Sequence, residues 1–261
     1  MDLGLANRTA LVLGAGGGLG GAIAVGLARE GASVALADVN EEALNSVSGE
    51  VAKYRGRVHS QKWNLADIED IDRHVSEIED RLGTIEILVN ITGGPPPTPV
   101  ADQPVDLWQD SFRSMVLSVI KITDRVLPGM RVRRWGRIIT SVSSGVISPI
   151  PNLGLSNSLR LALVGWSKTL ANEVAADGVT ANVIAPGRIG TDRIRFLDEA
   201  KARRESREVA DVVEESVAAI PMGRYGRPQE YADAVAFLAS NQASYITGSI
   251  TRVDGGYIPA V

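Results

Sequence analysis

A glycine-rich segment near the amino terminus carries the clearest chemical signal in the sequence. Residues 13–20 read LGAGGGLG and lie between an apolar run and a helical pattern. A pyrophosphate needs a tight turn, an approach free of Cβ atoms, and unpaired N–H groups at the start of a helix. Gly14, Gly18 and Gly20 occupy those positions. A glycine stretch alone also suits a plain turn, but its place after the first apolar run favours a dinucleotide site.

Asp38 is the second residue with a defined chemical use, because it ends the next apolar run, 18 residues after Gly20. A carboxylate there accepts hydrogen bonds from both hydroxyls of an adenosine ribose and repels a 2′-phosphate. Positions 16 and 17 are both glycine, so neither provides a basic side chain that would bind such a phosphate. We therefore expect NAD as the cofactor, with NADP less favoured. The alternative is that Asp38 only caps the helix after Asn40.

The elements that must position these residues alternate between short β-rich runs and longer helical patterns. Strands are expected at 9–13, 33–37, 57–63, 85–90, 137–142, 179–185 and 249–253. Helices are expected after the glycine segment, near residue 40, and at 105–130, 152–176 and 228–240, with a rigid Pro/Gly loop at 93–97. Residues 188–217 are charged and helical in pattern, as in an inserted lid. This alternation predicts an α/β fold, a single doubly wound domain of the Rossmann type over residues 1–261, with a parallel sheet of about seven strands.

Composition excludes several other classes of protein. The chain of 261 residues has no cysteine, which rules out disulfide, thiolate and cysteine–zinc chemistry, and we expect no metal site. The formal net charge is −4, and the longest basic cluster, residues 131–134, resembles a solvated helix end, so we expect no nucleic-acid partner. We find neither a signal-peptide pattern nor 18 consecutive apolar residues, so we expect a cytoplasmic protein without a membrane partner. The two histidines, His59 and His74, are expected at the surface.

Taken together, these motifs resemble the short-chain dehydrogenase/reductase family, in particular its 3-oxoacyl-ACP reductase-like members, nearly from end to end. The spacing of Gly14, Gly18 and Gly20 matches the family's cofactor loop. Residues 88–93 (LVNITG) resemble its Asn-Asn-Ala-Gly turn, although Ile91 and Thr92 depart from it. Residues 185–191 resemble the segment that contacts the nicotinamide, and residues 224–228 and 243–256 resemble the family's carboxy-terminal signature.

The resemblance implies a set of cofactor-binding residues and an assembly. Asn64 and Leu65 would flank the adenine, and Thr191 would hold the carboxamide. The complete expected set is Gly14, Gly18, Leu19, Gly20, Asp38, Asn64, Leu65, Asn90, Gly93, Pro186, Ile189 and Thr191. Members of the family commonly assemble through their two long helices, so a homotetramer or homodimer is expected.

The catalytic positions depart from the family pattern. The family uses a serine, a tyrosine 13 residues later and a lysine four residues beyond that. Residues 136–140 (GRIIT) fix the register and align the serine with Ser143, the tyrosine with Ser156 and the lysine with Arg160. The asparagine that the family has on the preceding long helix aligns with Met115. No tyrosine occurs between residues 54 and 225, so a shifted alignment does not restore the phenol.

These substitutions change what the site can do. A phenol, with a pKa of about 10, can be brought toward neutrality by a nearby ammonium, whereas a serine hydroxyl is too basic once ionised and arginine stays protonated. Losing a positioned acid or base typically costs about 10²–10⁴-fold in rate. Ser156 and Arg160 share a helix face at i, i+4, and together with Ser143 they form a polar cluster suited to a carboxylate, an enolate or an alkoxide-like oxygen. The alternative is a decayed site in which both residues only satisfy neighbouring polar groups.

The leading hypothesis is an NAD(H)-dependent oxidoreductase that acts on a small carbonyl compound or alcohol through Ser143, Ser156 and Arg160. A non-redox enzyme is the first alternative: halohydrin dehalogenases share this fold and use serine, tyrosine and arginine, but the missing tyrosine and the intact glycine loop count against them. A lyase, an isomerase, a hydrolase or an inactive NAD-binding protein stays open. The arginine-rich run from Arg188 favours an anionic substrate only if Arg188 and Arg193 face it, since the rest suits a solvated helix face.

Overall fold

The apolar runs form one parallel sheet in the computed structural model, which describes residues 2–260. The strand order is β3-β2-β1-β4-β5-β6-β7, and every neighbouring pair is parallel. The order reverses between β1 and β4, which makes the carboxyl ends of these strands the topological switch point where such sheets bind ligands. The strands are β1 (Thr9–Leu13), β2 (Ser33–Asp38), β3 (Val58–Lys62), β4 (Ile87–Asn90), β5 (Gly136–Ser141), β6 (Val179–Pro186) and β7 (Ile250–Val253).

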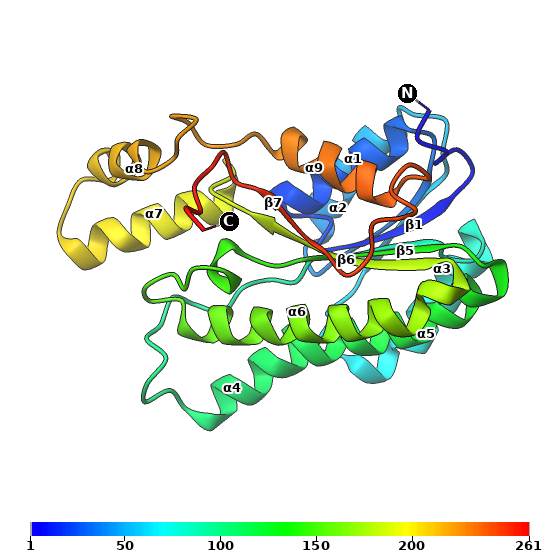
Figure 1. Cartoon of the computed structure of the whole chain (residues 1–261), viewed down its shortest axis with the longest axis horizontal. Coiled ribbons are helices and arrows are strands. Elements are labelled where there is room, and N and C mark those ends of the chain that lie inside the picture. Colours follow the sequence, from blue (N-terminus) through cyan, green and yellow to red (C-terminus); the bar gives the residue numbers. More distant parts are fainter. Residues whose placement is uncertain (1, 261) are drawn as a thin grey trace.

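Helices cover both faces of this sheet, as a doubly wound fold requires. One layer contains α1 (Gly18–Arg29), α2 (Glu41–Val51) and α9 (Pro228–Ala239), as Figure 1 shows. The opposite layer contains α3 (Ile71–Leu82), α4 (Val105–Phe112), α5 (Ser118–Arg133) and α6 (Gly154–Val174). Because both faces are covered, β1 and β4 are buried along their whole length, which explains why most of their residues are apolar. The predicted single doubly wound α/β fold is confirmed.

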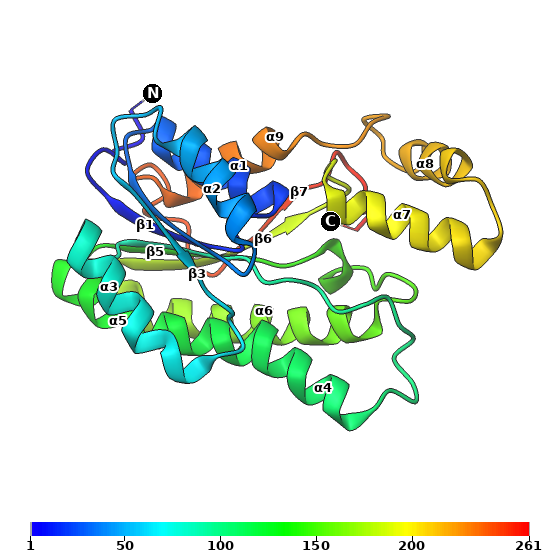
Figure 2. The ribbon, with the colours of Figure 1, turned by 180° about the vertical axis from the view of Figure 1, so that it is seen from behind.

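The predicted lid is a pair of helices that extends beyond the carboxyl ends of the strands. It consists of α7 (Asp192–Glu205) and α8 (Val209–Ala218), and Figures 1 and 2 show both helices projecting past the sheet. Glu215 of α8 accepts a hydrogen bond from Lys201 of α7 at 2.6 Å, which joins the two helices. The base of α7 is fixed by the buried carboxylate of Asp198, which pairs with Arg188 and accepts a hydrogen bond from the Tyr225 hydroxyl at 2.8 Å.

The long helix predicted at 105–130 is present, with a π turn, Arg113–Leu117, between α4 and α5 and an end at Arg133. One local prediction is wrong. His74 is buried rather than exposed, because its ring stacks on Trp63 at a centroid distance of 4.5 Å and hydrogen bonds to Gln61. Burial lowers the pKa of His74, with the Arg73 charge acting in the same direction, so this histidine is neutral at pH 7.

None of the helices in residues 2–260 combines the length and apolarity needed to cross a bilayer.

Candidate active site

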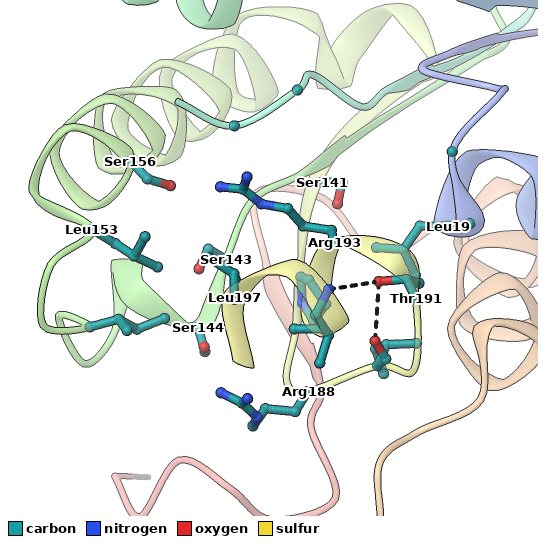
Figure 3. Close-up of a pocket in the computed structure, with 18 of the residues that line it drawn as sticks. Leu19, Ser141, Ser143, Ser144, Leu153, Ser156, Arg188, Thr191, Arg193 and Leu197 are labelled. Carbon is teal, nitrogen blue, oxygen red and sulfur yellow. Dashed lines mark hydrogen bonds between the residues drawn. The ribbon is translucent and has the colours of Figure 1, made fainter. Parts of the chain in front are cut away.

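A pocket of about 480 Å³ lies at the switch point, bounded by the carboxyl ends of the central strands, by α6 and by the lid helix α7. Most of the residues predicted from the sequence line it, although they come from distant parts of the chain. They are Gly14, Gly18, Leu19, Gly20, Asp38, Gly93, Ser143, Ser156, Arg160, Pro186, Ile189 and Thr191. One pocket therefore joins the predicted nucleotide end to the predicted catalytic end, and Figure 3 shows part of it.

The glycine turn at one end of the pocket is closed so tightly that side chains do not fit. Gly14 has a φ of +64°, in the left-handed region, and a Cβ there would lie 2.8 Å from the Ile91 carbonyl oxygen. A Cβ on Gly20 would lie 2.1 Å from the carbonyl oxygen of Gly14, and one on Gly18 would lie 2.9 Å from Cγ2 of Thr191. The start of α1 directs its free N–H groups to this end. The cradle fits the pyrophosphate of a dinucleotide.

Asp38 lies in the same wall, beside the glycine turn. Its Oδ2 accepts a hydrogen bond from the Gly16 N–H at 3.0 Å, and its Oδ1 accepts one from the Asn40 N–H at 2.9 Å. The cap of α2 is Asn40, whose side chain accepts from the Ala43 N–H at 3.1 Å. Asp38 is therefore not the helix cap, and each carboxylate oxygen keeps a further lone pair for a ligand hydroxyl.

Three residues of the predicted cofactor set do not line this pocket. Asn90 is buried within the sheet, where its side-chain amide donates to Thr140 Oγ1 at 3.2 Å, because β4 and β5 pair at this position. Asn64 is exposed, and its side chain bonds to Asp67 at 3.2 Å. Leu65 is partly buried and packs on a core cluster that includes Trp63 and apolar residues of α3. The side chain of Asn90 faces a neighbouring strand and not the pocket. The cofactor contacts of Asn90, Asn64 and Leu65 stay predictions.

Two serine hydroxyls stand at the other end of the pocket. Ser143 Oγ accepts a hydrogen bond from the Gly145 N–H at 3.1 Å, in the turn after β5. Ser156 Oγ accepts one from Nε of Arg160 at 3.3 Å, which confirms the i, i+4 pairing expected on α6. Because each oxygen already accepts an N–H, each O–H remains available to donate to a ligand in the pocket. Figure 3 shows both serines in the pocket wall.

Arg160 is a buried cation held almost entirely by the main chain. Its Nη1 donates to the Ser141 carbonyl at 3.2 Å, and its Nη2 donates to the carbonyls of Thr92 and Gly93 at 3.4 and 3.1 Å. The guanidinium thus ties the loop after β4 to the end of β5 and to α6. Burial lowers the pKa of Arg160 to about 10, with the charge of Arg193 adding to this effect, so the side chain is still protonated at pH 7.

Two tyrosines lie near this end of the pocket. The Tyr231 hydroxyl lies 2.7 Å from Ser141 Oγ behind the pocket wall and donates to the Ile184 carbonyl at 3.3 Å. Burial raises the pKa of Tyr231 well above its ordinary value, so it is a poor acid. Tyr257 follows β7 and lines the pocket of its own chain. Contacts between distant segments of the chain place Tyr231 behind the pocket wall and Tyr257 in it.

Comparison with known proteins agrees with this geometry. A family model described as enoyl-(acyl carrier protein) reductase matches residues 14–258. The 3-oxoacyl-[acyl-carrier-protein] reductase FabG of Salmonella typhimurium is 37% identical over 254 residues, covering 96% of this chain and 97% of that protein. L-Sorbose reductase from Gluconobacter frateurii, solved with NADPH and L-sorbose, superposes with a TM-score of 0.93 at 29% identity, covering 100% of both chains. NAD⁺-bound xylitol dehydrogenase gives a TM-score of 0.91 at 27% identity, covering 97% of this chain and 99% of that one.

These matches span almost the whole chain, and they agree with the glycine turn, the strand order and the carboxy-terminal motifs. The chain therefore belongs to the short-chain dehydrogenase/reductase family, a family of oxidoreductases.

Proposed function

We propose that this protein is an NAD(H)-dependent oxidoreductase that interconverts a small carbonyl compound and its alcohol at Ser143, Ser156 and Arg160. The observation that carries the proposal is the single pocket that joins an anion-binding glycine turn to two hydroxyl donors. In the reductive direction the carbonyl carbon gains a hydride and its oxygen gains a proton. The nicotinamide, when bound, would supply the hydride.

The two serines act on the substrate oxygen. Both O–H groups are free to donate, and both oxygens are held by N–H donors, so they form a small preorganised binding site for a negatively charged oxygen. Negative charge grows on the carbonyl oxygen as hydride reaches the carbon, so these hydrogen bonds strengthen toward the transition state. Arg160 positions Ser156 and holds the loop at Thr92 and Gly93.

The proton must come from outside this cluster, because neither a serine hydroxyl nor a guanidinium releases one near neutral pH. Solvent reaching the pocket is one source, and the phenol of Tyr257 in the pocket wall is the other. The substitution Tyr257→Phe separates them: a loss of kcat of about 10²-fold or more identifies the phenol as donor, and an unchanged kcat identifies water.

NAD is the expected cofactor because Asp38 provides a carboxylate where the adenosine ribose would bind. Its two oxygens are oriented by the N–H groups of Gly16 and Asn40, at the end of β2 where the ribose would lie. The negative charge would repel the 2′-phosphate of NADP. Gly14, Gly18 and Gly20 would hold the pyrophosphate, and Pro186, Ile189 and Thr191 would face the nicotinamide.

Two measurements test the proposal. In calorimetry with NAD⁺ and NADP⁺, the protein should bind NAD⁺ more tightly than NADP⁺. Variants that keep the glycine turn should bind in the same way. Absorbance of NADH, followed with a panel of small ketones, aldehydes and oxo acids, should show turnover. Tight NAD⁺ binding with no change in NADH for any member of the panel would favour an inactive NAD-binding protein. Consumption of a substrate without a change in NADH would favour a non-redox enzyme.

A further inference from the structure

Two arginines at the substrate end of the pocket have no acidic partner. Arg160 bonds only to a serine hydroxyl and to main-chain carbonyls. Arg193, near the start of α7, donates from Nη2 to the Pro95 carbonyl at 3.0 Å. Within residues 2–260, neither guanidinium forms a salt bridge with a carboxylate. Both side chains donate hydrogen bonds to the loop after β4. Arg160 bonds to the carbonyls of Thr92 and Gly93, and Arg193 bonds to that of Pro95. The two positive charges are therefore neighbours.

The other cations that line the pocket are matched by acidic residues. Arg188 pairs with Asp198, Lys201 with Glu215 at 2.6 Å, and Arg204 with Glu205 at 3.3 Å. Among the cations of the pocket wall in residues 2–260, only Arg160 and Arg193 therefore lack a carboxylate partner. Burial lowers the pKa of both arginines, and the charge of Arg193 further lowers that of Arg160. Arg160 is buried, whereas Arg193 is open to solvent, so an anion that entered the pocket could reach Arg193 and reduce the repulsion between the two charges.

The donors that remain unused show how an anion would bind. A guanidinium has five N–H donors, and Arg193 uses one of them. Arg160 uses four, which leaves it one N–H and its charge. The free edge of Arg193 matches the two oxygens of a carboxylate. In Figure 3 the Arg193 side chain extends from α7 toward Ser156, away from the glycine turn, so the anion it selects lies beside the serine hydroxyls.

We infer that the substrate carries a carboxylate close to its reacting carbon, and that Arg193 binds this carboxylate while Arg160 supplies the second positive charge. The ligand class is a short oxo acid or hydroxy acid in which the reacting carbon is the second or third carbon from the carboxyl end. The inference deepens the proposed oxidoreductase function and relies on it for the reacting carbon. The charge argument itself needs no turnover.

A dead-end complex tests the inference without chemistry. NADH and an alcohol are both reduced, so calorimetry on the NADH-loaded protein measures binding alone. The probes are 2-hydroxybutanoate and 3-hydroxybutanoate, each compared with its uncharged methyl ester. At least one acid should bind about 10- to 100-fold more tightly than its ester, and Arg193→Gln should remove that difference. Arg193→Lys keeps the positive charge but loses the paired N–H donors of the guanidinium. Its affinity for the acids should lie between those of the parent protein and Arg193→Gln.

The matched control is Arg203→Gln. Arg203 lies on the same helix, its side chain is 67% exposed, and it does not line the pocket. This variant should bind acid and ester as the parent protein does, and the NADH affinity of Arg193→Gln should also be unchanged. Equal affinity of acids and esters in the parent protein would overturn the inference. So would a loss of NADH affinity in Arg193→Gln with no effect on the acids, because the arginine would then serve the dinucleotide.

The inference and the proposed function fail in different ways. If the acids bind in a charge-dependent manner but no oxo acid changes the NADH signal, the anion site stands and the oxidoreductase function falls. If uncharged ketones are reduced as well as oxo acids and Arg193→Gln has no effect, the function stands and the anion site falls.

Discussion

The two ends of the pocket place different demands on the sequence. At the nucleotide end the requirement is an absence of atoms: a Cβ on Gly20 would lie 2.1 Å from a backbone oxygen, so only glycine fits. At the substrate end the requirement is the presence of particular donors, supplied by Ser143 in the turn after β5 and by Ser156 and Arg160 on α6. The first end carries the glycine spacing of the family, and the second carries two serines and an arginine. Binding of a dinucleotide and the chemistry performed on a substrate are therefore separable properties of this fold.

Arg160 has a structural role at the substrate end that does not depend on proton transfer. The side chain holds three main-chain carbonyls of the loop and of β5, and it orients Ser156. These bonds need donors in a fixed geometry, which a guanidinium provides. They do not need a group that can exchange a proton. A residue that cannot relay protons can therefore still position the pocket wall.

The largest effect is expected at the nucleotide end. Gly20→Ala should weaken NAD⁺ binding by about 10³-fold or more, because the added Cβ forces the turn at Gly14 open and displaces the start of α1. Calorimetry measures this, with thermal unfolding as a check that the variant folds. Gly49→Ala is the control, since a Cβ there meets nothing within 4 Å. It should leave NAD⁺ binding intact and stabilise α2 by about 0.5–1 kcal/mol. A folded Gly20→Ala protein that binds NAD⁺ normally would contradict the assigned cradle.

The next effect is a gain at the substrate end. The double substitution Ser156→Tyr with Arg160→Lys restores a phenol beside an amine, so NADH-dependent reduction of an uncharged ketone should rise by about 10²–10⁴-fold. A lysine at position 160 cannot make all the hydrogen bonds that Arg160 donates, so the melting temperature of the double variant should fall. Ser156→Tyr alone should gain far less, because a guanidinium does not relay protons. If the folded, NADH-binding double variant stays inactive, the missing tyrosine and lysine are not what limits the rate.

Removing one hydroxyl should have a smaller effect. Ser156→Ala should lower kcat by about 10²-fold, as expected for the loss of one donor to a developing negative charge. Ser158→Ala is the matched control, because Ser158 is exposed on the same helix and its hydroxyl donates to the Gly154 carbonyl at 2.9 Å. Steady-state kinetics with NADH should show normal turnover for this control. Equal rates for the two variants would exclude Ser156 from the reaction.

The sequence predicted the fold well because its main signals are local. The apolar run at 9–13 became β1 with the same bounds, and the glycine turn follows directly from residue type. The helical spacing of Ser156 and Arg160 correctly predicted their contact. A periodicity of 3.6 residues describes α-helical turns and does not single out one wider turn such as 113–117.

What the sequence could not predict are partners that lie far apart along the chain. The carbonyls that Arg160 bonds, the contact of Tyr231 with Ser141, and the burial of His74 against Trp63 all depend on how layers pack. Asn90 was assigned to the cofactor by its motif, yet strand pairing directs its amide to Thr140. Side-chain direction at a strand end depends on neighbouring strands, which a motif does not encode.

A moderate effect is expected on cofactor choice. Asp38→Ala should weaken NAD⁺ binding by about 10-fold and strengthen NADP⁺ binding, so the ratio of the two Kd values moves toward one. The loss of two ribose hydrogen bonds accounts for the first change and the loss of charge repulsion for the second. Calorimetry with both dinucleotides provides the ratio, and the substrate end should be unaffected. The NAD assignment would be wrong if the parent protein already bound NADP⁺ as tightly as NAD⁺.

The smallest effect concerns the lid at the substrate end. Hydrogen bonds from Lys201 and Arg207 lower the pKa of Glu215 to about 2, from an ordinary value of 4.5. Because the folded-state pKa is the lower one, this contact stabilises the lid fully above pH 4.5, and the contribution disappears as the pH falls toward about 2. Glu215 is exposed, so solvent screens much of the interaction.

Glu215→Gln should therefore lower the melting temperature slightly at pH 7, and the difference from the parent protein should narrow between pH 5 and about 3. Loosening α8 from α7 should raise KM for the substrate, about twofold, and leave the Kd of NADH unchanged, because the glycine turn does not depend on this contact. A variant that weakened NADH binding as much as substrate binding would show that the two ends of the pocket are not independent. It would then be the lid, rather than the strands, that couples the nucleotide site to the substrate site.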